Sequence, residues 1–247
     1  MILAPEQHVD VQTPTGPMRT YVLRPLAEGK YPGVVFYSEI FQVTGPIRRA
    51  AQFLAGHGYV VAVPEIFHEL EGAHGVVLEY DQAGADRGNA HKIAKDLAAY
   101  DSDARAALDM LAEHPACNGA LGAMGICIGG HLAWRTAFQP DVKATVCFYA
   151  TDIHTSTLGF GQNDDTIQRF GDISGELLTV WGRQDPHIPR AGRELIHAAL
   201  DDAGIEFSWH EVNGQHAFLR DEGARYDAEL ARQLFGVALD LFHRRLR

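Results

Sequence analysis

Cysteine is scarce in this chain: it has three among 247 residues, an odd number. So sparse a set, without the paired spacing of metal ligands, predicts neither a disulfide framework nor a metal site and favours a reducing compartment. Long apolar runs are also absent. No stretch of about 18 apolar residues could form a membrane span, and residues 1–10 lack the basic flank and apolar run of a signal peptide. We therefore expect a cytoplasmic protein with no membrane association, metal or cofactor.

Basic residues are outnumbered, since 21 Lys and Arg against 32 Asp and Glu give a formal net charge of −11. This balance argues against nucleic acid or an anionic membrane as a partner and leaves a small molecule as the expected ligand. Internal repeats, low-complexity tracts and linkers between domains are absent too. With 46% hydrophobic residues the chain can bury a substantial core, so we expect one domain over residues 1–247. A monomer and a homo-oligomer are both compatible with the sequence.

The remaining pattern is that of an α/β protein, with apolar strand-like runs alternating with amphipathic stretches. Two strands around the turn at residues 13–16 predict an antiparallel N-terminal hairpin, at 8–13 and 18–24. Further strands are expected at 33–38, 58–64, 120–124, 143–149, 176–181 and 206–212. Helices are expected at 46–57, 90–113, 131–138, 190–203 and around 230–241. The order predicts a mostly parallel central sheet flanked by helices.

Two segments lack a clear period. Residues 65–89 are rich in Gly, His and acidic residues, which predicts a long surface loop or a lid over a site. Residues 150–174 are also irregular. If a pocket exists, these two segments are expected to form its walls.

The stretch Gly125-Ile126-Cys127-Ile128-Gly129-Gly130 lies where an expected strand gives way to an expected helix. A nucleophile on such a sharp turn needs small neighbours, because its backbone is strained and its flanks crowd strand against helix. Most free cysteines are small buried hydrophobes, but the glycine frame favours a nucleophile at Cys127. Cys147, in mid-strand, is expected in the core, and Cys117 is expected to be an inert loop residue.

Four reactive side chains follow expected strands, in the chain order Glu39, Cys127, Asp185 and His216. The carboxyl ends of parallel strands meet at one edge of a sheet, so these groups should gather there. The last three follow the order nucleophile, acid, histidine. Sulfur attacks as thiolate, His216 exchanges a proton near neutral pH, and Asp185 fixes its tautomer. Glu39 could instead be only a charge at a helix start.

Other residues compete for these roles or complete them. His187 and His131 are alternatives to His216 as the base, and Asp164 or Asp165 are alternatives to Asp185. Cys127 and His131 could in principle ligate a metal, but the set lacks further ligands. The backbone N–H groups of two residues that follow strands could hold an oxyanion, those of Ile128 and Ile40.

With these motifs in order, the chain resembles the dienelactone hydrolase family of the α/β-hydrolase fold over nearly its whole length. The matching pieces are Glu39-Ile40-Phe41, Pro64-Glu65-Ile66-Phe67, the stretch around Cys127, Gly182-Arg183-Gln184-Asp185-Pro186 and His216-Ala217-Phe218-Leu219-Arg220.

The resemblance implies that Cys127 rests as a thiol and that Glu39 helps to turn it into thiolate when substrate displaces the carboxylate. It also implies a thioester intermediate, released by water with His216 as base. Arg220 is then expected to bind a substrate carboxylate, although it could pair at the surface with Asp221 or Glu222 instead.

Two departures from the family pattern concern the pocket. A second arginine, usual in members that open dienelactone, is replaced by the stretch His68-Glu69-Leu70. Glu69 would repel a carboxylate if it faced the pocket, and Arg87 is the nearby candidate substitute. Gln42 stands where a glycine is usual, and its side chain could narrow the cleft or contribute a hydrogen bond.

Two tyrosines near strand ends, Tyr37 and Tyr149, are expected to contact substrate, with core packing as the alternative. The sequence therefore predicts a cysteine-dependent hydrolase of small esters or lactones. A thiol redox or peroxide-responsive protein and a non-catalytic binding protein on a hydrolase fold are the two alternatives.

Overall fold

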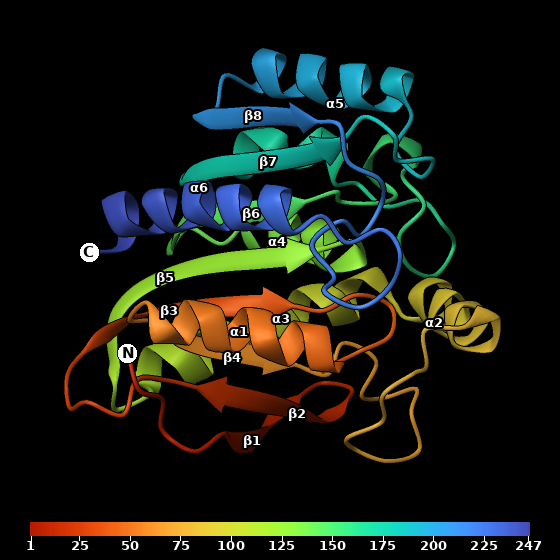
Figure 1. The fold of residues 1–247 in the computed structure, drawn as a ribbon. Helices are drawn as coiled ribbons and strands as arrows, with labels where there is room; N and C mark the ends of the chain where they lie inside the picture. The colour runs from red at the N-terminus through yellow and green to blue at the C-terminus, as the bar shows by residue number, and fades with distance from the viewer.

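Eight strands form one sheet in the computed structural model, which describes residues 1–247 (Figure 1). The strands are β1 Gln7–Thr13, β2 Gly16–Leu23, β3 Tyr31–Tyr37, β4 Val60–Pro64, β5 Cys117–Ile126, β6 Val142–Phe148, β7 Glu176–Gly182 and β8 Phe207–Val212. Their spatial order is β1-β2-β4-β3-β5-β6-β7-β8. Strand β2 pairs antiparallel with β1 and with β4, and every later pair is parallel. The predicted α/β fold and its N-terminal hairpin are confirmed.

Helices cover both faces of the sheet. They are α1 Gly45–Gly56, α2 Gln82–Ala94, α3 Leu97–Glu113, α4 Ile128–Thr136, α5 Arg190–Ala203 and α6 Ala228–Leu246, with short 3₁₀ helices η1 Ile153–Thr155 and η2 Ile167–Asp172. Helices α1 and α6 pack on one face and α3 and α4 on the other (Figure 1). The parallel strands all end on the side where α2 and the long loops lie.

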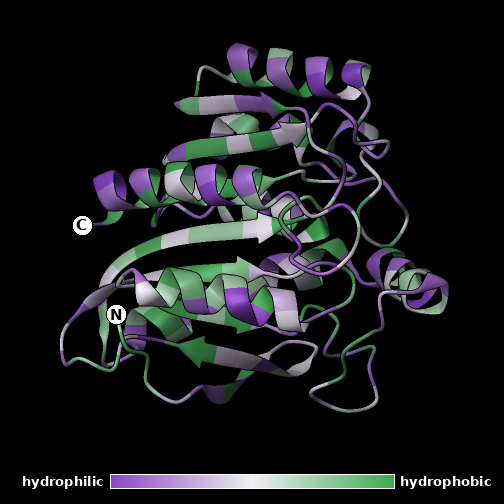
Figure 2. Ribbon diagram, viewed as in Figure 1, coloured by the Kyte–Doolittle hydropathy of each residue, from purple (hydrophilic) through white to green (hydrophobic).

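The central strands are buried on both faces, as a sheet covered by two helical layers requires. All five residues of β4 are buried, and Val34, Val35 and Phe36 of β3 are fully enclosed. Figure 2 shows the same contrast, with apolar central strands and helices that carry polar residues on their outer sides. This continuous apolar pattern is why the strands could be predicted from the sequence.

The stretch around residue 95 differs from the prediction of one helix over 90–113. Helix α2 ends at Ala94 and α3 begins at Leu97, because Lys95 adopts an extended backbone and buries its side chain completely. Its ammonium group donates to Asp103 of α3 at 2.5 Å. Ile93, near the end of α2, is 40% exposed. The buried ion pair of Lys95 and Asp103 therefore breaks the helix that the apolar periodicity predicted.

The segment 65–89 also contains more regular structure than expected. Residues 65–81 form turns, but from Gln82 the chain is helical, with the Asp81 carboxylate accepting a hydrogen bond from the Gly84 N–H at 2.8 Å. Helix α2 has no apolar face that would reveal it in the sequence. Its beginning is specified by the N-cap residue instead.

The structural cysteines lie in strands. Cys147 is completely buried in β6, as predicted, and burial raises the pKa of its thiol. Cys117 does not lie in a loop: it begins β5 and is 5% exposed. Its strand position follows from pairing with Tyr31 of β3, which extends β5 beyond the apolar run used to predict it.

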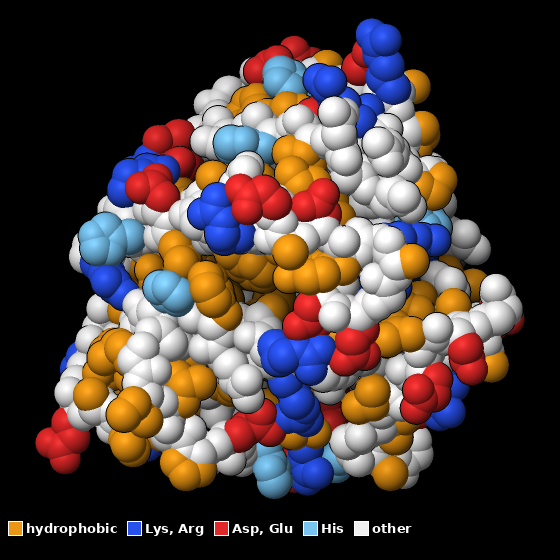
Figure 3. Space-filling view, in the orientation of Figure 1, with side chains coloured by type: hydrophobic (Ala, Val, Ile, Leu, Met, Phe, Trp, Pro, Cys, Tyr) orange, Lys and Arg blue, Asp and Glu red, His pale blue; other side chains and the backbone are white.

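Charge on the surface is mixed. On the face shown in Figure 3, acidic and basic side chains lie next to one another, and no broad basic area appears there. None of the helices is both long and apolar enough to span a bilayer.

Candidate active site

A cavity of about 510 Å³ opens at the carboxyl ends of the parallel strands. Glu39 follows β3, Cys127 follows β5 and His216 follows β8, and all three line this cavity. Asp185, which follows β7, lies behind His216. The topology thus brings together the four side chains that the sequence singled out.

Cys127 occupies a sharp turn between β5 and α4. Its backbone has φ 59° and ψ −127°, a conformation that non-glycine residues rarely adopt, and its N–H donates to the Phe148 carbonyl at 3.1 Å. A Cβ atom on Gly125 would lie 1.8 Å from the Gly129 carbonyl oxygen, and one on Gly129 would lie 2.4 Å from that of Tyr37. Only glycines fit at these positions, so the motif has the steric basis of a nucleophile elbow.

His216 is held by Asp185. Its Nδ1–H donates to the Asp185 carboxylate at 2.7 Å, and the second oxygen of that carboxylate accepts from the His187 backbone N–H at 2.8 Å. Burial alone would lower the pKa of His216. The negative charges of Cys127 and Asp185 outweigh it and raise this pKa to about 10. A thiolate at Cys127 and an imidazolium at His216 would therefore stabilise each other.

Two backbone N–H groups are available near the sulfur. Ile128 begins α4 and Ile40 lies in the loop after β3, and neither N–H donates to another protein group. The N-terminus of α4 adds a partial positive charge at the same place. These groups fit the predicted oxyanion site.

Glu39 and Arg220 form an ion pair at the cavity. The guanidinium Nη1 lies 3.3 Å from one Glu39 oxygen, while the other oxygen is buried without a partner. Burial raises the pKa of Glu39, against the opposing effects of Arg220 and His216. The Arg220 guanidinium also stacks over the Tyr80 ring at 4.2 Å.

Arg220 does not pair with its acidic neighbours as the surface alternative required. The carboxylates of Asp221 and Glu222 bind Arg49 at 2.6 Å and 2.8 Å. With these two neighbours Arg220 makes only one hydrogen bond, to the backbone carbonyl of Glu222. Its charge is therefore directed to the cavity.

Neither tyrosine lines the cavity, but Tyr149 packs against a residue that does. Tyr149 is fully buried, its ring packs edge-on against His216 at 5.1 Å, and its hydroxyl has no hydrogen-bond partner. Burial, with added effects of Glu39 and Cys127, raises the pKa of Tyr149. Tyr37 does not line the cavity, so its expected substrate contact is wrong: it lies in the core, where its hydroxyl accepts from Thr136 at 2.8 Å.

Helix α2 supplies one wall of the cavity, as expected for the segment 65–89, although the sequence did not predict that this wall is helical. Its lining residues recur at helical spacing, at Gln82, Ala85, Asn89 and Lys92. The Lys92 ammonium contacts both oxygens of Asp152 at 3.0 Å and so connects α2 to the loop after β6. The spacing of these residues, in steps of three, four and three, was the available signal for a helix in the sequence. It was missed because most of these residues are polar.

Glu69 does not face the cavity. Its carboxylate binds Lys95 at 2.8 Å, and Arg87 binds Glu71 instead of lining the cavity. The condition under which Glu69 would repel a carboxylate is therefore not met, and Arg87 does not substitute for the second arginine. Gln42 is buried at φ 66°, which explains why glycine suits this position, and its side-chain oxygen accepts from the Phe67 N–H at 3.4 Å.

The donors of both candidate metal groups are engaged with protein. His131 contacts the Thr151 carbonyl and the Thr166 hydroxyl at 2.8 Å each, so it is not paired with Cys127. A second group, formed by His68, Glu69 and Asp103, has metal-like spacing. The Lys95 ammonium already contacts both of its carboxylates and supplies the positive charge.

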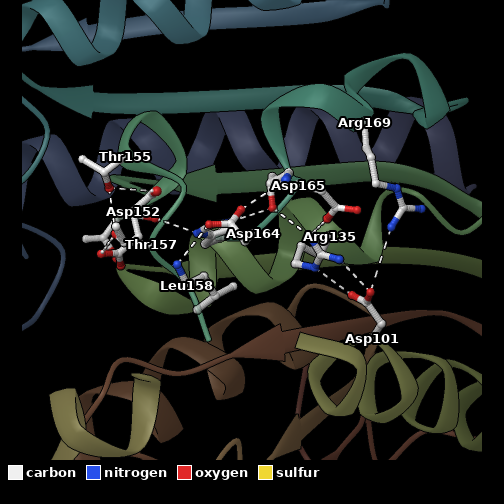
Figure 4. Close-up of polar contacts among 12 residues, drawn as sticks. Asp101, Arg135, Asp152, Thr155, Thr157, Leu158, Asp164, Asp165 and Arg169 are labelled. Carbon is white, nitrogen blue, oxygen red and sulfur yellow. Dashed lines mark hydrogen bonds and ion pairs between the residues drawn. The ribbon is translucent and has the colours of Figure 1, made fainter. Parts of the chain in front are cut away.

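The acidic alternatives to Asp185 belong to a separate network beside Arg135 of α4 (Figure 4). Asp164 accepts from the backbone N–H groups of Leu158 and Thr166, and Asp165 pairs with Arg135 at 2.8 Å. This network fixes the loop 150–174 and makes no contact with His216. Asp185 is therefore the carboxylate placed to orient the histidine.

The chain is similar to known proteins over nearly its whole length. The sequence profile of the dienelactone hydrolase family matches residues 18–246. A Saccharomyces cerevisiae protein, provisionally named a carboxymethylenebutenolidase, is 42% identical over 100% of this chain and 94% of its own. The carboxymethylenebutenolidase of Pseudomonas putida is 27% identical over 83% of this chain and 82% of its own. A provisionally named dienelactone hydrolase from Klebsiella pneumoniae shares the fold, with a TM-score of 0.85 and 23% identity over 99% of this chain and 100% of that one.

Proposed function

The chain belongs to the dienelactone hydrolase family and is a carboxymethylenebutenolidase-like hydrolase, and we propose that it opens small carboxylic esters or lactones through a thioester on Cys127. The observation that carries this proposal is the coupling of three groups: Cys127 on a strained turn, His216 beside it, and Asp185 2.7 Å behind His216. This is the arrangement that nucleophilic acyl transfer requires.

In the acylation step the Cys127 thiolate attacks the carbonyl carbon of the substrate. The developing oxyanion is held by the N–H groups of Ile40 and Ile128, which have no other acceptor. As the carbon–oxygen bond breaks, the leaving alcohol oxygen takes the proton from His216. A thioester on Cys127 and a neutral His216 remain.

The pair Glu39 and Arg220 links activation to substrate entry. A substrate carboxylate that binds Arg220 releases Glu39 from its ion pair, and burial already favours the protonated form of Glu39. The freed carboxylate can then take the thiol proton of Cys127 and leave the thiolate. Substrates that carry a carboxylate are therefore the proposed preference, with Tyr149 packed beside the reacting groups.

In the deacylation step water attacks the thioester carbonyl carbon. The thioester carries no charge on sulfur, so the main influence that raises the pKa of His216 is removed and the imidazole can act as base. His216 takes one proton from the water, the carbon–sulfur bond breaks, and the acid product leaves. This leaves Cys127 as thiolate and His216 as imidazolium, and once the product has left, Glu39 returns its proton to Cys127 and pairs with Arg220 again.

Mass spectrometry of acid-quenched protein tests this proposal. After exposure to a panel of activated esters and lactones, the wild type should gain one acyl group on Cys127. The substitution Cys127→Ala should remove the adduct and lower hydrolysis by about 10³-fold or more. Cys117→Ala, which changes a buried cysteine at the start of β5, is the matched control and should hydrolyse normally. Hydrolysis at the wild-type rate by Cys127→Ala contradicts the mechanism.

A further inference from the structure

One histidine at the cavity has no part in the reaction described so far. His187 lies in the loop after β7, where its backbone N–H donates to Asp185, and its side chain lines the cavity beside His216. The two imidazole rings meet edge-on, with centroids 4.6 Å apart. Neither ring nitrogen of His187 is hydrogen-bonded to another protein group, although the backbone that carries the ring is fixed.

The surroundings of His187 keep its imidazole neutral. Burial lowers its pKa, the charge of His216 lowers it further, and Arg225 acts in the same direction. Asp185 and Asp152 oppose these effects without reversing them. A neutral imidazole offers one N–H donor and one lone pair, and both are available at the cavity.

A group with these properties can orient the water that deacylation consumes. The hydrolytic water gives one proton to His216, whose Nδ1 is already bound to Asp185, so only Nε2 can receive it. The second hydrogen of this water needs an acceptor that leaves an oxygen lone pair directed at the thioester. A single water can contact both histidines, because their ring centroids are only 4.6 Å apart.

We propose that His187 accepts the second hydrogen of the hydrolytic water and so holds that water for attack on the acyl-Cys127 thioester. This role rests on the proposed function. In the step, the water oxygen bonds to the carbonyl carbon and one proton moves to His216. The carbon–sulfur bond then breaks, with its electron pair staying on sulfur. The hydrogen held by His187 remains on the acid product, and His187 ends the step neutral.

Variants of His187 test this role because its link to Asp185 is through the backbone and survives substitution. His187→Phe keeps a flat ring of similar size but has no nitrogen, and His187→Asn restores an acceptor. In His187→Phe we expect acylation of Cys127 at the normal rate and deacylation slowed about 10-fold or more, so that the thioester accumulates. His187→Asn should recover part of the loss. The measurement is the burst of product release followed by the steady rate, with intact mass to count the adduct.

A histidine outside the cavity provides the control. His197→Ala removes a histidine of α5 that pairs with Asp201 and lies outside the cavity, and it should leave both phases unchanged. Equal deacylation rates in wild type and His187→Phe overturn the role of His187 while leaving the thioester mechanism in place. A wild type that never forms a Cys127 adduct overturns the proposed function, and the role of His187 with it. If His187→Phe does not fold, His187→Ala supplies the same comparison.

Discussion

At the scale of single residues, the site depends on a backbone conformation that is unfavourable by itself. A non-glycine residue at φ 59° and ψ −127° costs on the order of 1–3 kcal/mol. The strain is maintained by the close approach of strand and helix at Gly125 and Gly129. Its effect is to place the sulfur of Cys127 in the cavity, beside His216 and near the N-terminus of α4.

The coupling between Cys127 and His216 predicts an unusual titration. NMR of labelled histidine should show the His216 imidazole titrating far above 6.5, near the expected value of about 10. Cys127→Ala should bring this pKa down, because the charge of Cys127 is the largest influence that raises it. The raised pKa of His216 also makes the stability of the fold depend on pH. The contribution of the pair is fully present below pH 6.5 and is lost as the pH rises towards 10. Equal titration of His216 in both proteins would show that the two groups are not coupled.

The four residues at strand ends could be found in the sequence because each follows a buried apolar run. Glu39, Cys127, Asp185 and His216 needed only the rule that parallel strands end at one edge. Tyr37 follows the same rule but its hydroxyl bonds Thr136 in the core. Strand position alone does not decide on which side of the sheet a side chain lies.

At the scale of elements, the junction of α2 and α3 shows what the sequence did not reveal. Lys95 is completely buried, and its ammonium donates to the Ile66 carbonyl as well as to Glu69 and Asp103. The partners lie far along the chain from it or on another helix, so no local pattern predicts the break. Helix α2 is likewise specified by its cap and by ion pairs such as Lys92 with Asp152.

This junction predicts a large loss of stability on removal of Lys95. Burial would raise the pKa of Asp103, but His68 and Lys95 outweigh it and hold it low, so Asp103 is charged in the interior. Lys95→Met leaves that charge and Glu69 uncompensated and should lower the free energy of unfolding by about 3–5 kcal/mol. Urea denaturation measures the change.

Two further variants test the cause of this loss of stability. Lys95→Met combined with Asp103→Asn should recover part of the stability, since the buried charge is then removed too. Lys143→Met, which changes an exposed lysine that contacts only a backbone carbonyl, should be nearly neutral. A neutral effect of Lys95→Met would mean that water or other groups solvate Asp103.

At the scale of the whole molecule, the order of the strands and of most helices was predictable, and so were the two segments that form the cavity wall, but the structure of that wall was not. Buried parallel strands require apolar runs, and such runs are visible in any sequence. The wall is built from α2 and the loop 150–174, whose residues are polar and are fixed by contacts between distant segments. His131 of α4, for example, holds this loop through the carbonyl of Thr151, which itself lines the cavity.

The network that anchors this loop predicts how the molecule responds to acid. Burial would raise the pKa of Asp164, but hydrogen bonds from His131 and from the backbone lower it to about 2, against 3.8 when unperturbed. A lowered pKa stabilises the fold above pH 3.8, and this contribution is lost as the pH falls towards 2. Asp164→Asn should therefore destabilise the protein by about 2 kcal/mol at pH 7 and should weaken the dependence of its stability on pH between 4 and 2. The neighbouring Asp165→Asn, an exposed partner of Arg135, is the control and should change stability far less. Urea denaturation at a series of pH values makes the comparison, and parallel acid profiles for wild type and Asp164→Asn would assign the acid sensitivity to other carboxylates.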